Sequence, residues 1–426
     1  MTKLALHWQI LIAIIVATIA GLVTGTDASL FGVSFYAIYG FVGALFLNAL
    51  KMIIVPLVAS SIITGIARIG DSNSLGRLGG KTILFYATSS LLAILVGLAL
   101  VNITTPGIIN GQAAGEQLNL TTDANELAMV VEKVEGKSAS DISDVFLRLV
   151  PTNIIAAAAG GQMLGLIFFS LLFGFFMTRI DKDKSDVMKN FWQGVFDIMM
   201  HITLWVMKFA PLGVFGLVAK TVAATGFAAF SPLLIFFVTV VAALCIHTFI
   251  TMPLLLRFLG RVRSGLFFKK MSPVMLTAFS TSSSSATLPL TLETVEKDIG
   301  VSNKTTSFVL PLGATVNMDG TALYECVAAM FIAQAYGLEL SMVQQFTIVL
   351  VALLTSIGVA GIPAASLVAI TIVLGVIGLP LEGLGLLLVT DRILDMMRTA
   401  VNVCGDCVGT VIIARSEGEQ TRIAAS

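Results

Sequence analysis

Long apolar runs separated by short polar segments dominate the sequence. Runs of about 20 residues, each long enough to cross the hydrocarbon core of a bilayer as a helix, recur along the chain. The first run has no convincing cleavage site after it, so we expect it to be retained as a span. We predict eight membrane-spanning helices, at 8–25, 37–66, 81–103, 146–178, 190–220, 229–259, 303–337 and 381–414.

Two further apolar stretches, at about 264–297 and 341–376, are interrupted near their middles by small and helix-breaking residues. The first contains the serine run Ser282–Ser285, and the second contains Gly358 and Pro363. Each interruption favours a re-entrant helical hairpin, whose unpaired backbone groups must be satisfied by protein or by water in a cavity. A hairpin followed by a span occurs twice, a pattern typical of inverted repeats around a transporter binding site.

Composition and charge agree with a membrane protein and indicate its orientation. Of the 426 residues, 57% are hydrophobic and 12% charged, whereas soluble domains carry about 25% charged residues. The formal net charge of zero gives no indication of nucleic-acid binding. Segments 67–81 and 257–270 are basic and 104–145 is acidic. Because basic loops stay in the cytoplasm, we expect both termini there and 104–145 outside.

The last predicted span carries a polar face. At about 100° per residue, six polar side chains fall within one arc of the helix, namely Asp391, Asp395, Arg398, Thr399, Asn402 and Asp406. Charges are costly at the centre of a bilayer, so this face is expected to meet a cavity, ions or other polar groups. The alternative is a structural ion-pair network, but the acids outnumber the arginine on this face.

The preceding span contains the polar segment Asn317–Thr321. Gly320, flanked by polar residues, predicts an unwound turn. Unwinding exposes carbonyl oxygens, which suit the coordination shell of a hard monovalent cation. The alternative is a glycine kink in which Asp319 caps a helix.

Residues that could support catalysis are present without the surroundings that catalysis needs. The run Ser282–Ser285 could supply a nucleophile and His247 a base, but no nucleophile elbow accompanies them. Serine hydroxyls and free N–H groups at a hairpin tip suit a carboxylate better. Cys404 and Cys407 have C-x-x-C spacing but no second pair for a metal or redox site. We expect no enzymatic activity and no organic cofactor.

The chain resembles the dicarboxylate/amino acid:cation symporters, a family that includes prokaryotic aspartate and glutamate transporters and animal excitatory amino-acid transporters. The resemblance covers essentially the whole chain and is most specific in Ser282–Pro289, Asn317–Thr321, Ser356–Pro363 and Asp391–Asp406. It implies an all-α integral membrane protein with eight transmembrane helices and two re-entrant helical hairpins in inverted repeats. It also implies sodium-driven symport of L-glutamate and/or L-aspartate across the cell membrane by a homotrimer with an elevator mechanism.

The resemblance implies a division into two bodies. Residues 1–80 and 104–220, the latter including the external loop, would form a fixed trimerisation scaffold. Residues 81–103 and 221–414, with both hairpins, would form a moving transport domain. Residues 415–426 would form a cytoplasmic tail.

The resemblance also implies a substrate site. Arg398 would pair with the side-chain carboxylate of the substrate, with help from Thr321, and Asp395 would hold the ammonium group. The other implied substrate-binding residues are Ser283, Ser284, Ser285, Gly361, Thr399 and Asn402. Gly358 and Gly361 would let the second hairpin open as a gate.

Three sodium sites are implied in the same way. The first would use Gly313, Asn317, Asn402 and Asp406. The second would use Thr315, Met318, Ser356 and Ile357. The third would use Tyr86, Ser89, Ser90, Asn317 and Asp319.

The chain departs from the family at positions that bear on electrostatics. Relatives usually carry an arginine beside the substrate where this chain has Ser282 or Met396, which leaves the charge of the empty carrier and any potassium counter-transport open. Glu325 resembles the acid of proton-cotransporting relatives. Because burial favours the protonated form of a carboxyl group, Glu325 is the candidate proton carrier.

Alternatives remain open at this point. The same fold could serve a proton-coupled dicarboxylate carrier or a neutral amino-acid carrier. A dicarboxylate without an amino group would leave Asp395 unpaired, and neutral carriers generally lack an arginine at position 398. An ion channel or a membrane enzyme using the serine run or Cys404 and Cys407 is a further alternative.

Overall fold

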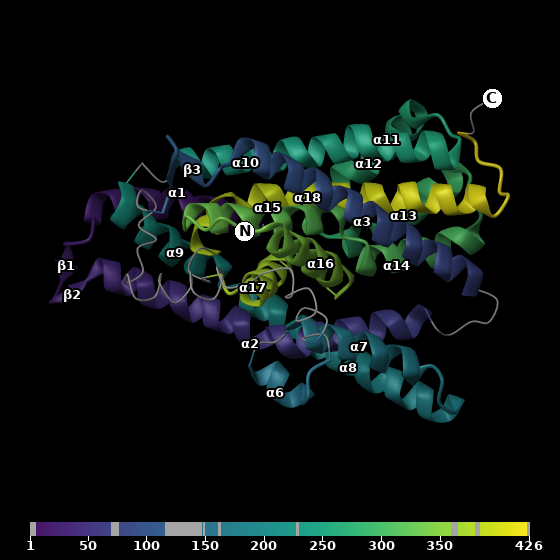
Figure 1. Ribbon diagram of the computed structural model, residues 1–426, viewed down its shortest axis with the longest axis horizontal. Coiled ribbons are helices and arrows are strands. Elements are labelled where there is room, and N and C mark those ends of the chain that lie inside the picture. The colour runs from purple at the N-terminus through teal and green to yellow at the C-terminus, as the bar shows by residue number, and fades with distance from the viewer. Residues whose placement is uncertain are drawn as a thin grey trace, which may run out of the picture.

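The computed structural model describes residues 6–69, 76–115, 147, 150–160, 163–226, 230–358, 365–379 and 384–423. Within these ranges most residues are helical, and most helices run roughly along the long axis of the molecule (Figure 1). The strands described are two short antiparallel pairs, β1 (Ser29–Leu30) with β2 (Val33–Ser34), and β3 (Ile108–Ile109) with β4 (Gln112–Ala113).

One side of the molecule is a layer of helices that forms small apolar clusters of its own and contributes a few residues of two of its helices to the large core of the other side. This layer consists of α1 (Leu6–Thr24), α2 (Phe35–Ile69), α6 (Ile154–Ala159), α7 (Met163–Met177), α8 (Lys182–Met207) and α9 (Ala210–Thr225). α9 packs against α1 and α2, and α2 also contacts α7 and α8. A Cβ atom at Gly213 would lie 2.2 Å from the ring of Phe46, so the close approach of α9 to α2 requires glycine there.

The other side shares one large apolar core. Its longer helices are α3 (Gly76–Thr104), α10 (Phe230–Ile246), α12 (Ser264–Thr281), α13 (Ser284–Thr294), α14 (Asn303–Val316), α15 (Asp319–Ala335), α16 (Met342–Gly358), α17 (Ala365–Ile377) and α18 (Leu384–Ser416). Short segments extend α10 and α13, namely η2 (His247–Thr251), α11 (Met252–Leu255), η3 (Leu256–Gly260) and η4 (Val295–Ile299). α15 is central, because every residue of this helix except Gln334 is buried.

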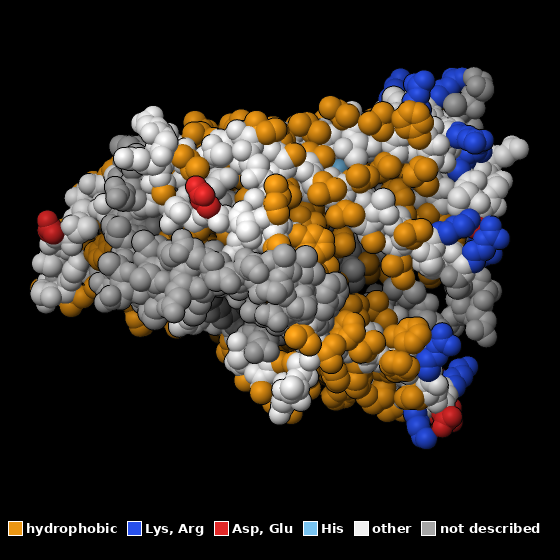
Figure 2. Space-filling model, in the orientation of Figure 1, with side chains coloured by type: hydrophobic (Ala, Val, Ile, Leu, Met, Phe, Trp, Pro, Cys, Tyr) orange, Lys and Arg blue, Asp and Glu red, His pale blue; other side chains and the backbone are white. Residues whose placement is uncertain are grey.

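The described helices are compatible with a membrane. Three are long and apolar enough to cross one, Arg77–Thr104, Ser231–Gly260 and Thr390–Ser416, and the bent pair α8 and α9 would make a fourth if counted as one span. Figure 2 shows apolar side chains along the middle of the visible face. Lys and Arg side chains gather at the end where α18 finishes (Figures 1 and 2).

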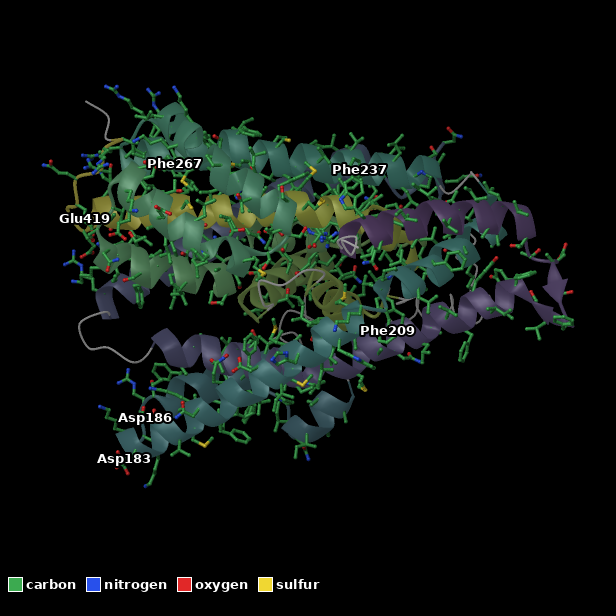
Figure 3. The ribbon with its side chains drawn as sticks, turned by 180° about the vertical axis from the view of Figure 1, so that it is seen from behind. Asp183, Asp186, Phe209, Phe237, Phe267 and Glu419 are labelled. Carbon is green, nitrogen blue, oxygen red and sulfur yellow. The ribbon has the colours of Figure 1, made fainter. Side chains whose placement is uncertain are left out.

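The residues after α18 connect that helix to α14 and α3 at this end of the molecule. Glu419 accepts hydrogen bonds from the N–H of Ser302 at 2.8 Å and from the hydroxyl of Thr305 at 2.5 Å, both at the start of α14. Lys81 in α3 forms an ion pair with Glu417. Figure 3 shows Glu419 at the same end of the long axis as Asp183 and Asp186.

The predicted span 190–220 is not one straight helix. The chain bends by 52° between α8 and α9. Pro211 lies in the first turn of α9, and proline has no backbone N–H to continue the hydrogen-bond pattern of the preceding helix. The N–H groups of Leu212 and Gly213 both bond to the carbonyl of Phe209, which starts the new helix.

The predicted span 146–178 is also wrong as a single helix. Residues 150–153 lie outside any helix. Asn153 then starts the separate helix α6, because its side chain accepts hydrogen bonds from the N–H groups of Ile155 and Ala156, as capping residues do.

The first interrupted stretch breaks near its middle as predicted, whereas the middle of the second, residues 359–364, lies outside the described residues. Within 264–297, α12 gives way to α13 at Ser282, which has the left-handed φ of 49° that ends a helix. Within 341–376, α16 ends at Gly358 and α17 begins at Ala365. The predicted gate residue Gly361 lies outside the described residues.

Candidate functional site

The polar face predicted for α18 is buried in the protein. Asp391, Asp395, Arg398, Asn402 and Asp406 are each 6% exposed or less. The helix is continuous across all of them, so the helical spacing assumed from the sequence holds. α18 packs against α3, α12, α14 and α15, which supply the partners of its polar side chains.

The N-terminal part of this face holds two acids and two arginines, which we call the charged cluster: Asp391, Arg392, Asp395 and Arg398. Nη2 of Arg398 donates to Asp391 at 2.9 Å and to Asp395 at 3.2 Å. Its guanidinium group lies 3.8 Å from the ring centroid of Tyr324 in α15, an arrangement that suits a planar cation. The predicted pair Arg398 and Asp395 is thus in direct contact, with Asp391 and Tyr324 as additional partners.

Arg392 is a member of this cluster to which the sequence-based prediction gave no role. Nη1 of Arg392 donates to Asp395 at 3.2 Å, and Nη2 donates to the hydroxyl of Ser282 at 3.0 Å. A signal exists in the sequence, because Arg392 lies roughly 100° from Asp391 around the helix, at the edge of the polar face. Its partner Ser282 is distant in sequence and cannot be inferred from spacing.

The predicted carboxylate-binding serines lie at the start of α13, beside the charged cluster. The hydroxyl of Ser283 accepts the N–H of Ala286 at 3.2 Å and caps the helix. Ser284 is buried and Ser285 is exposed. The contact between Ser282 and Arg392 holds this helix N-terminus against α18, and helix N-termini favour anions. On α18 itself, Thr399 donates its hydroxyl to the carbonyl of Asp395 at 2.8 Å.

The unwound turn between α14 and α15 lies earlier than predicted. The non-helical residues are Asn317 and Met318, with φ of −98° and −126°, whereas Gly320 is already inside the first turn of α15. A Cβ atom at Gly320 would lie 2.8 Å from the carbonyl oxygen of Arg398. Glycine at this position therefore serves the close approach of α15 to α18, which a single sequence does not distinguish from unwinding.

This close approach joins two predicted substrate residues. The N–H of Gly320 donates to Oδ1 of Asn402 at 2.8 Å. Nδ2 of Asn402 in turn donates to the hydroxyl of Thr321 at 3.1 Å.

A second buried group of polar side chains, which we call the cation cluster, consists of Ser89, Ser90, His247, Asn317, Asp319 and Asp406. Asp319 accepts hydrogen bonds from Ser89 at 2.5 Å and Ser90 at 2.7 Å, and Nε2 of His247 lies 3.3 Å away. The sequence-based prediction missed His247 here. Among the described residues, neither Asp319 nor Asp406 forms an ion pair with a lysine or arginine.

Asn317 links the unwound turn to α18. Its Nδ2 donates to Asp406 at 2.9 Å. Its Oδ1 is buried and has no hydrogen-bond partner in the described part of the chain. A Cβ atom at Gly313 would lie 2.5 Å from the hydroxyl of Tyr86 and 2.6 Å from Oδ1 of Asp406. Oxygen atoms of Tyr86 and Asp406 therefore lie close to Gly313, and no lysine or arginine in the described ranges pairs with Asp406. Oxygens are the ligands that hard cations prefer.

The residues predicted for the second sodium site are less closely associated. The hydroxyl of Thr315 donates to the carbonyl of Leu312 at 2.9 Å, and that of Ser356 to the carbonyl of Leu353 at 2.7 Å, each within its own helix. The side chain of Ile357 lies outside what the structure describes.

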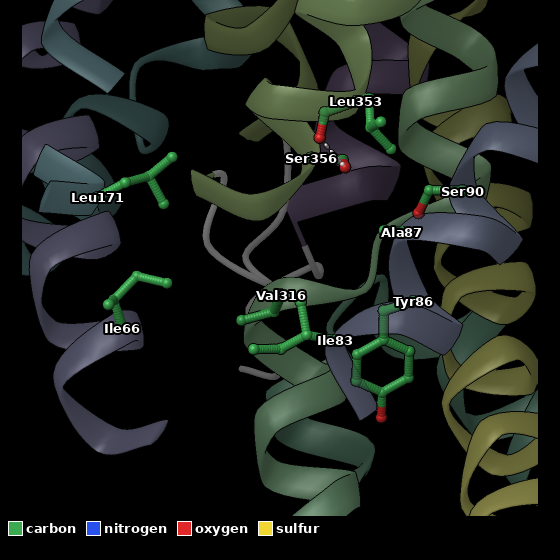
Figure 4. A pocket seen from close by; sticks show the side chains of 9 residues that line it. All are labelled: Ile66, Ile83, Tyr86, Ala87, Ser90, Leu171, Val316, Leu353 and Ser356. Atoms are coloured by element: carbon green, nitrogen blue, oxygen red, sulfur yellow. Dashed lines mark hydrogen bonds between the residues drawn. The ribbon is translucent and has the colours of Figure 1, made fainter. Parts of the chain in front are cut away.

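A cavity of about 130 Å³ lies between the two sides of the molecule (Figure 4). Ile66 in α2 and Leu171 in α7 line it on one side. Tyr86, Ser90 and Ser356, three of the predicted ion ligands, line it on the other. The predicted ion sites therefore lie close to the boundary between the two helical layers.

Glu325 is buried deeper in α15. Its Oε2 accepts the hydroxyl of Thr355 in α16 at 2.6 Å. Its Oε1 has no hydrogen-bond partner within the described ranges. The predicted proton carrier thus has one neutral partner and one free oxygen.

Known proteins are similar to this chain along nearly its whole length. A model of the sodium:dicarboxylate symporter family matches residues 6–416. The proton/sodium-glutamate symport protein of Bacillus caldotenax is 36% identical over 98% of this chain and 96% of its own. The proton/glutamate-aspartate symporter of Escherichia coli (strain K12) is 36% identical over 97% and 93%. Excitatory amino acid transporter 3 of Homo sapiens is 32% identical over 96% and 85%.

Proposed function

The chain belongs to the sodium:dicarboxylate symporter family, and from this premise we propose that it is a symporter that imports L-glutamate and/or L-aspartate together with sodium ions. The observation that carries the proposal is the buried contact between Arg398 and Asp395 beside acids that have no lysine or arginine partner among the described residues. The relatives named as glutamate and aspartate symporters support the same substrate class. Membership in a transporter family also fits the expectation of a non-enzyme.

Substrate binding would exchange partners within the charged cluster. Arg398 presents a planar fork that matches a carboxylate, so the side-chain carboxylate of the substrate would replace Asp391 and Asp395 on this guanidinium group. Asp395 would then accept the substrate ammonium. The α-carboxylate would lie between Asn402 and the helix N-terminus that begins at Ser284, with Gly361 in the second interrupted stretch closing the site.

Coupling to sodium would pass through the segment between α14 and α15. Asn317 and Asp319 belong to the cation cluster, whereas Gly320 and Thr321 contact Asn402 in the substrate site. Sodium bound at Asn317 and Asp319 would fix this short segment and, with it, the position of Asn402. A cation and a substrate that favour the same arrangement bind cooperatively.

The two helical layers would be the two bodies of an elevator. The apolar cluster that α1, α2, α8 and α9 form among themselves supports this division, and α2 and α7 contact the large core of the other layer through Val58, Ile62, Leu166 and Ile167. The layer with α1, α2 and α7–α9 would be the trimerisation scaffold, and the layer with α3 and α10–α18 the moving transport domain. The end rich in lysine and arginine would face the cytoplasm by the positive-inside rule, which places the tail there.

Uptake into proteoliposomes tests the function. We expect radiolabelled L-glutamate or L-aspartate to accumulate when an inward sodium gradient is imposed, and Arg398→Ala to abolish the uptake. Arg257→Ala removes an exposed arginine and should transport like the wild type. Uptake driven by protons without sodium would overturn the sodium coupling. Absence of uptake of both amino acids under every gradient would overturn the substrate class.

A further inference from the structure

Arg392 is a buried arginine that the substrate scheme above does not use. It is 7% exposed and bonds to Asp395 on its own helix and to Ser282 at the turn before α13. A buried charge is retained only where partners compensate its lost hydration. The compensation here comes from Asp395, the acid proposed to receive the substrate ammonium.

The charged cluster is balanced without substrate, because two guanidinium groups face two carboxylates. Asp391 accepts from Arg398, whereas Asp395 accepts from both arginines through different oxygens. Arg398 uses Oδ1 of Asp395, and Arg392 uses Oδ2. When a substrate carboxylate takes Arg398, Oδ1 of Asp395 loses its bond from Arg398 while Oδ2 keeps its bond to Arg392.

A substrate without an amino group would therefore not leave Asp395 unpaired, contrary to the expectation from sequence. A site built around a hydrogen bond to a substrate group typically rejects the analogue lacking that group by about 10⁴-fold or more, because the site's own buried group is then unpaired. Arg392 removes much of that penalty, since Asp395 keeps a charged partner in either case.

We propose that Arg392 determines how strongly the site requires an amino group on its substrate. The inference rests on the proposed function, and Arg392 acts through Asp395 as a positioning residue. With Arg392 present, amine-free C4 and C5 dicarboxylates compete with the acidic amino acids. Without Arg392, Asp395 loses the arginine that remains bound to it when a substrate carboxylate takes Arg398, so the substrate ammonium contributes more and discrimination in favour of amino acids increases.

The hydrogen bond to Ser282 fixes Nη2 of the Arg392 guanidinium group. Ser282 is buried in a left-handed turn, so its hydroxyl position is set by the backbone. Ser282→Ala would remove one neutral partner and leave the pairing of Arg392 with Asp395. This variant therefore separates the charge of Arg392 from its contact with the turn.

Competition against sodium-driven L-aspartate uptake tests the proposal in the full-length protein. The measured quantity is the ratio of inhibition constants for succinate and L-aspartate, and likewise for glutarate and L-glutamate. We expect a wild-type ratio of about 100-fold, well below the roughly 10⁴-fold of an unpaired acid. Arg392→Gln should raise the ratio at least 10-fold, whereas Arg392→Lys and Ser282→Ala should change it less than about 3-fold, a difference small on the scale of a charged contact.

Two results would overturn the inference. One is a wild type that already rejects succinate and glutarate about 10⁴-fold. This measurement uses no variant, so it does not depend on whether a variant folds. The other is an unchanged or lower ratio in Arg392→Gln, measured in detergent by ligand-induced thermal stabilisation if the variant binds but does not transport. A wild type without sodium-driven uptake of either amino acid would instead overturn the proposed function.

Discussion

The buried acids at the two ends of the polar face of α18 have different kinds of partners. In the charged cluster, Asp391 and Asp395 are matched by two arginines of the same helix. In the cation cluster, Asp319 and Asp406 have hydroxyl, amide and imidazole partners but, among the described residues, no lysine or arginine. The two arginines of the charged cluster can exchange a carboxylate partner for the carboxylate of a competing anion. The absence of such fixed charges around Asp319 and Asp406 in the described part of the chain supports the proposal that sodium binds there.

Removing a carboxylate from the cation cluster should have the largest effect. In Asp319→Asn, the cluster loses the anion that Ser89 and Ser90 support, so sodium binds poorly. We expect the sodium concentration for half-maximal uptake to rise on the order of 100-fold, since losing even a residue that supports a metal ligand costs about 10–100-fold in affinity. Sodium titration of uptake measures it. Asp186→Asn, at an exposed position, is the control, and an unchanged sodium dependence in Asp319→Asn would mean that the cation binds elsewhere.

The boundary between the two clusters should be the next most sensitive place. In Gly320→Ala, the new methyl group would lie 2.8 Å from the carbonyl oxygen of Arg398, so α15 and α18 must separate. Overpacking of this kind costs about 1–3 kcal/mol, and we expect both sodium and substrate affinity to fall roughly 10-fold.

The matched control for this steric change is Gly194→Ala in α8, where a Cβ atom would contact nothing within 4 Å. Both affinities come from the same uptake titrations. If only one of the two affinities fell in Gly320→Ala, the two clusters would not be coupled through this contact.

Neutralising Glu325 should have a smaller and more selective effect. Glu325→Gln keeps a side chain that can bond to Thr355 but carries no exchangeable acidic proton. We expect the stimulation of uptake by an inward proton gradient, a few-fold effect on a coupled carrier, to disappear while sodium dependence stays. Uptake at fixed sodium and varied external pH measures it, with the exposed Glu339→Gln as control. Full proton dependence in Glu325→Gln would remove Glu325 as the proton carrier.

The smallest effect is expected from the exposed ion pair between Lys81 and Glu417. The hydrogen bond from Lys81 holds the pKa of Glu417 below its usual value, so this pair stabilises the fold above the ordinary pKa of a glutamate and loses its effect as pH falls through the lowered value. Surface pairs contribute about 0–1 kcal/mol, and Glu417→Gln should lower Tm only slightly near neutral pH. Thermal unfolding should show the difference from the wild type vanish in acid; a difference that grew in acid would contradict this sign.

Sequence patterns correctly predicted the features that are determined within a single helix. The polar face of α18 could be predicted because the helix is unbroken, and the break at Ser282 because small residues interrupt an apolar run. The turn at Asn317 and Met318 was placed at Gly320, since a glycine needed for a close approach looks the same in sequence as one needed for unwinding. The partnership of Arg392 with Ser282 could not be predicted, because it joins segments 110 residues apart.

The burial of α18 also has a consequence for biogenesis. Of the three long described spans it is the least apolar, and its charges make it a poor substrate for insertion into lipid on its own. The partners of those charges, Ser282, Asn317 and Tyr324, are translated earlier, so α18 can enter the bilayer by joining neighbours that are already there. Until it arrives, Asn317 lacks its partner Asp406, and a nascent chain halted before residue 384 would present this polar group to cellular quality control.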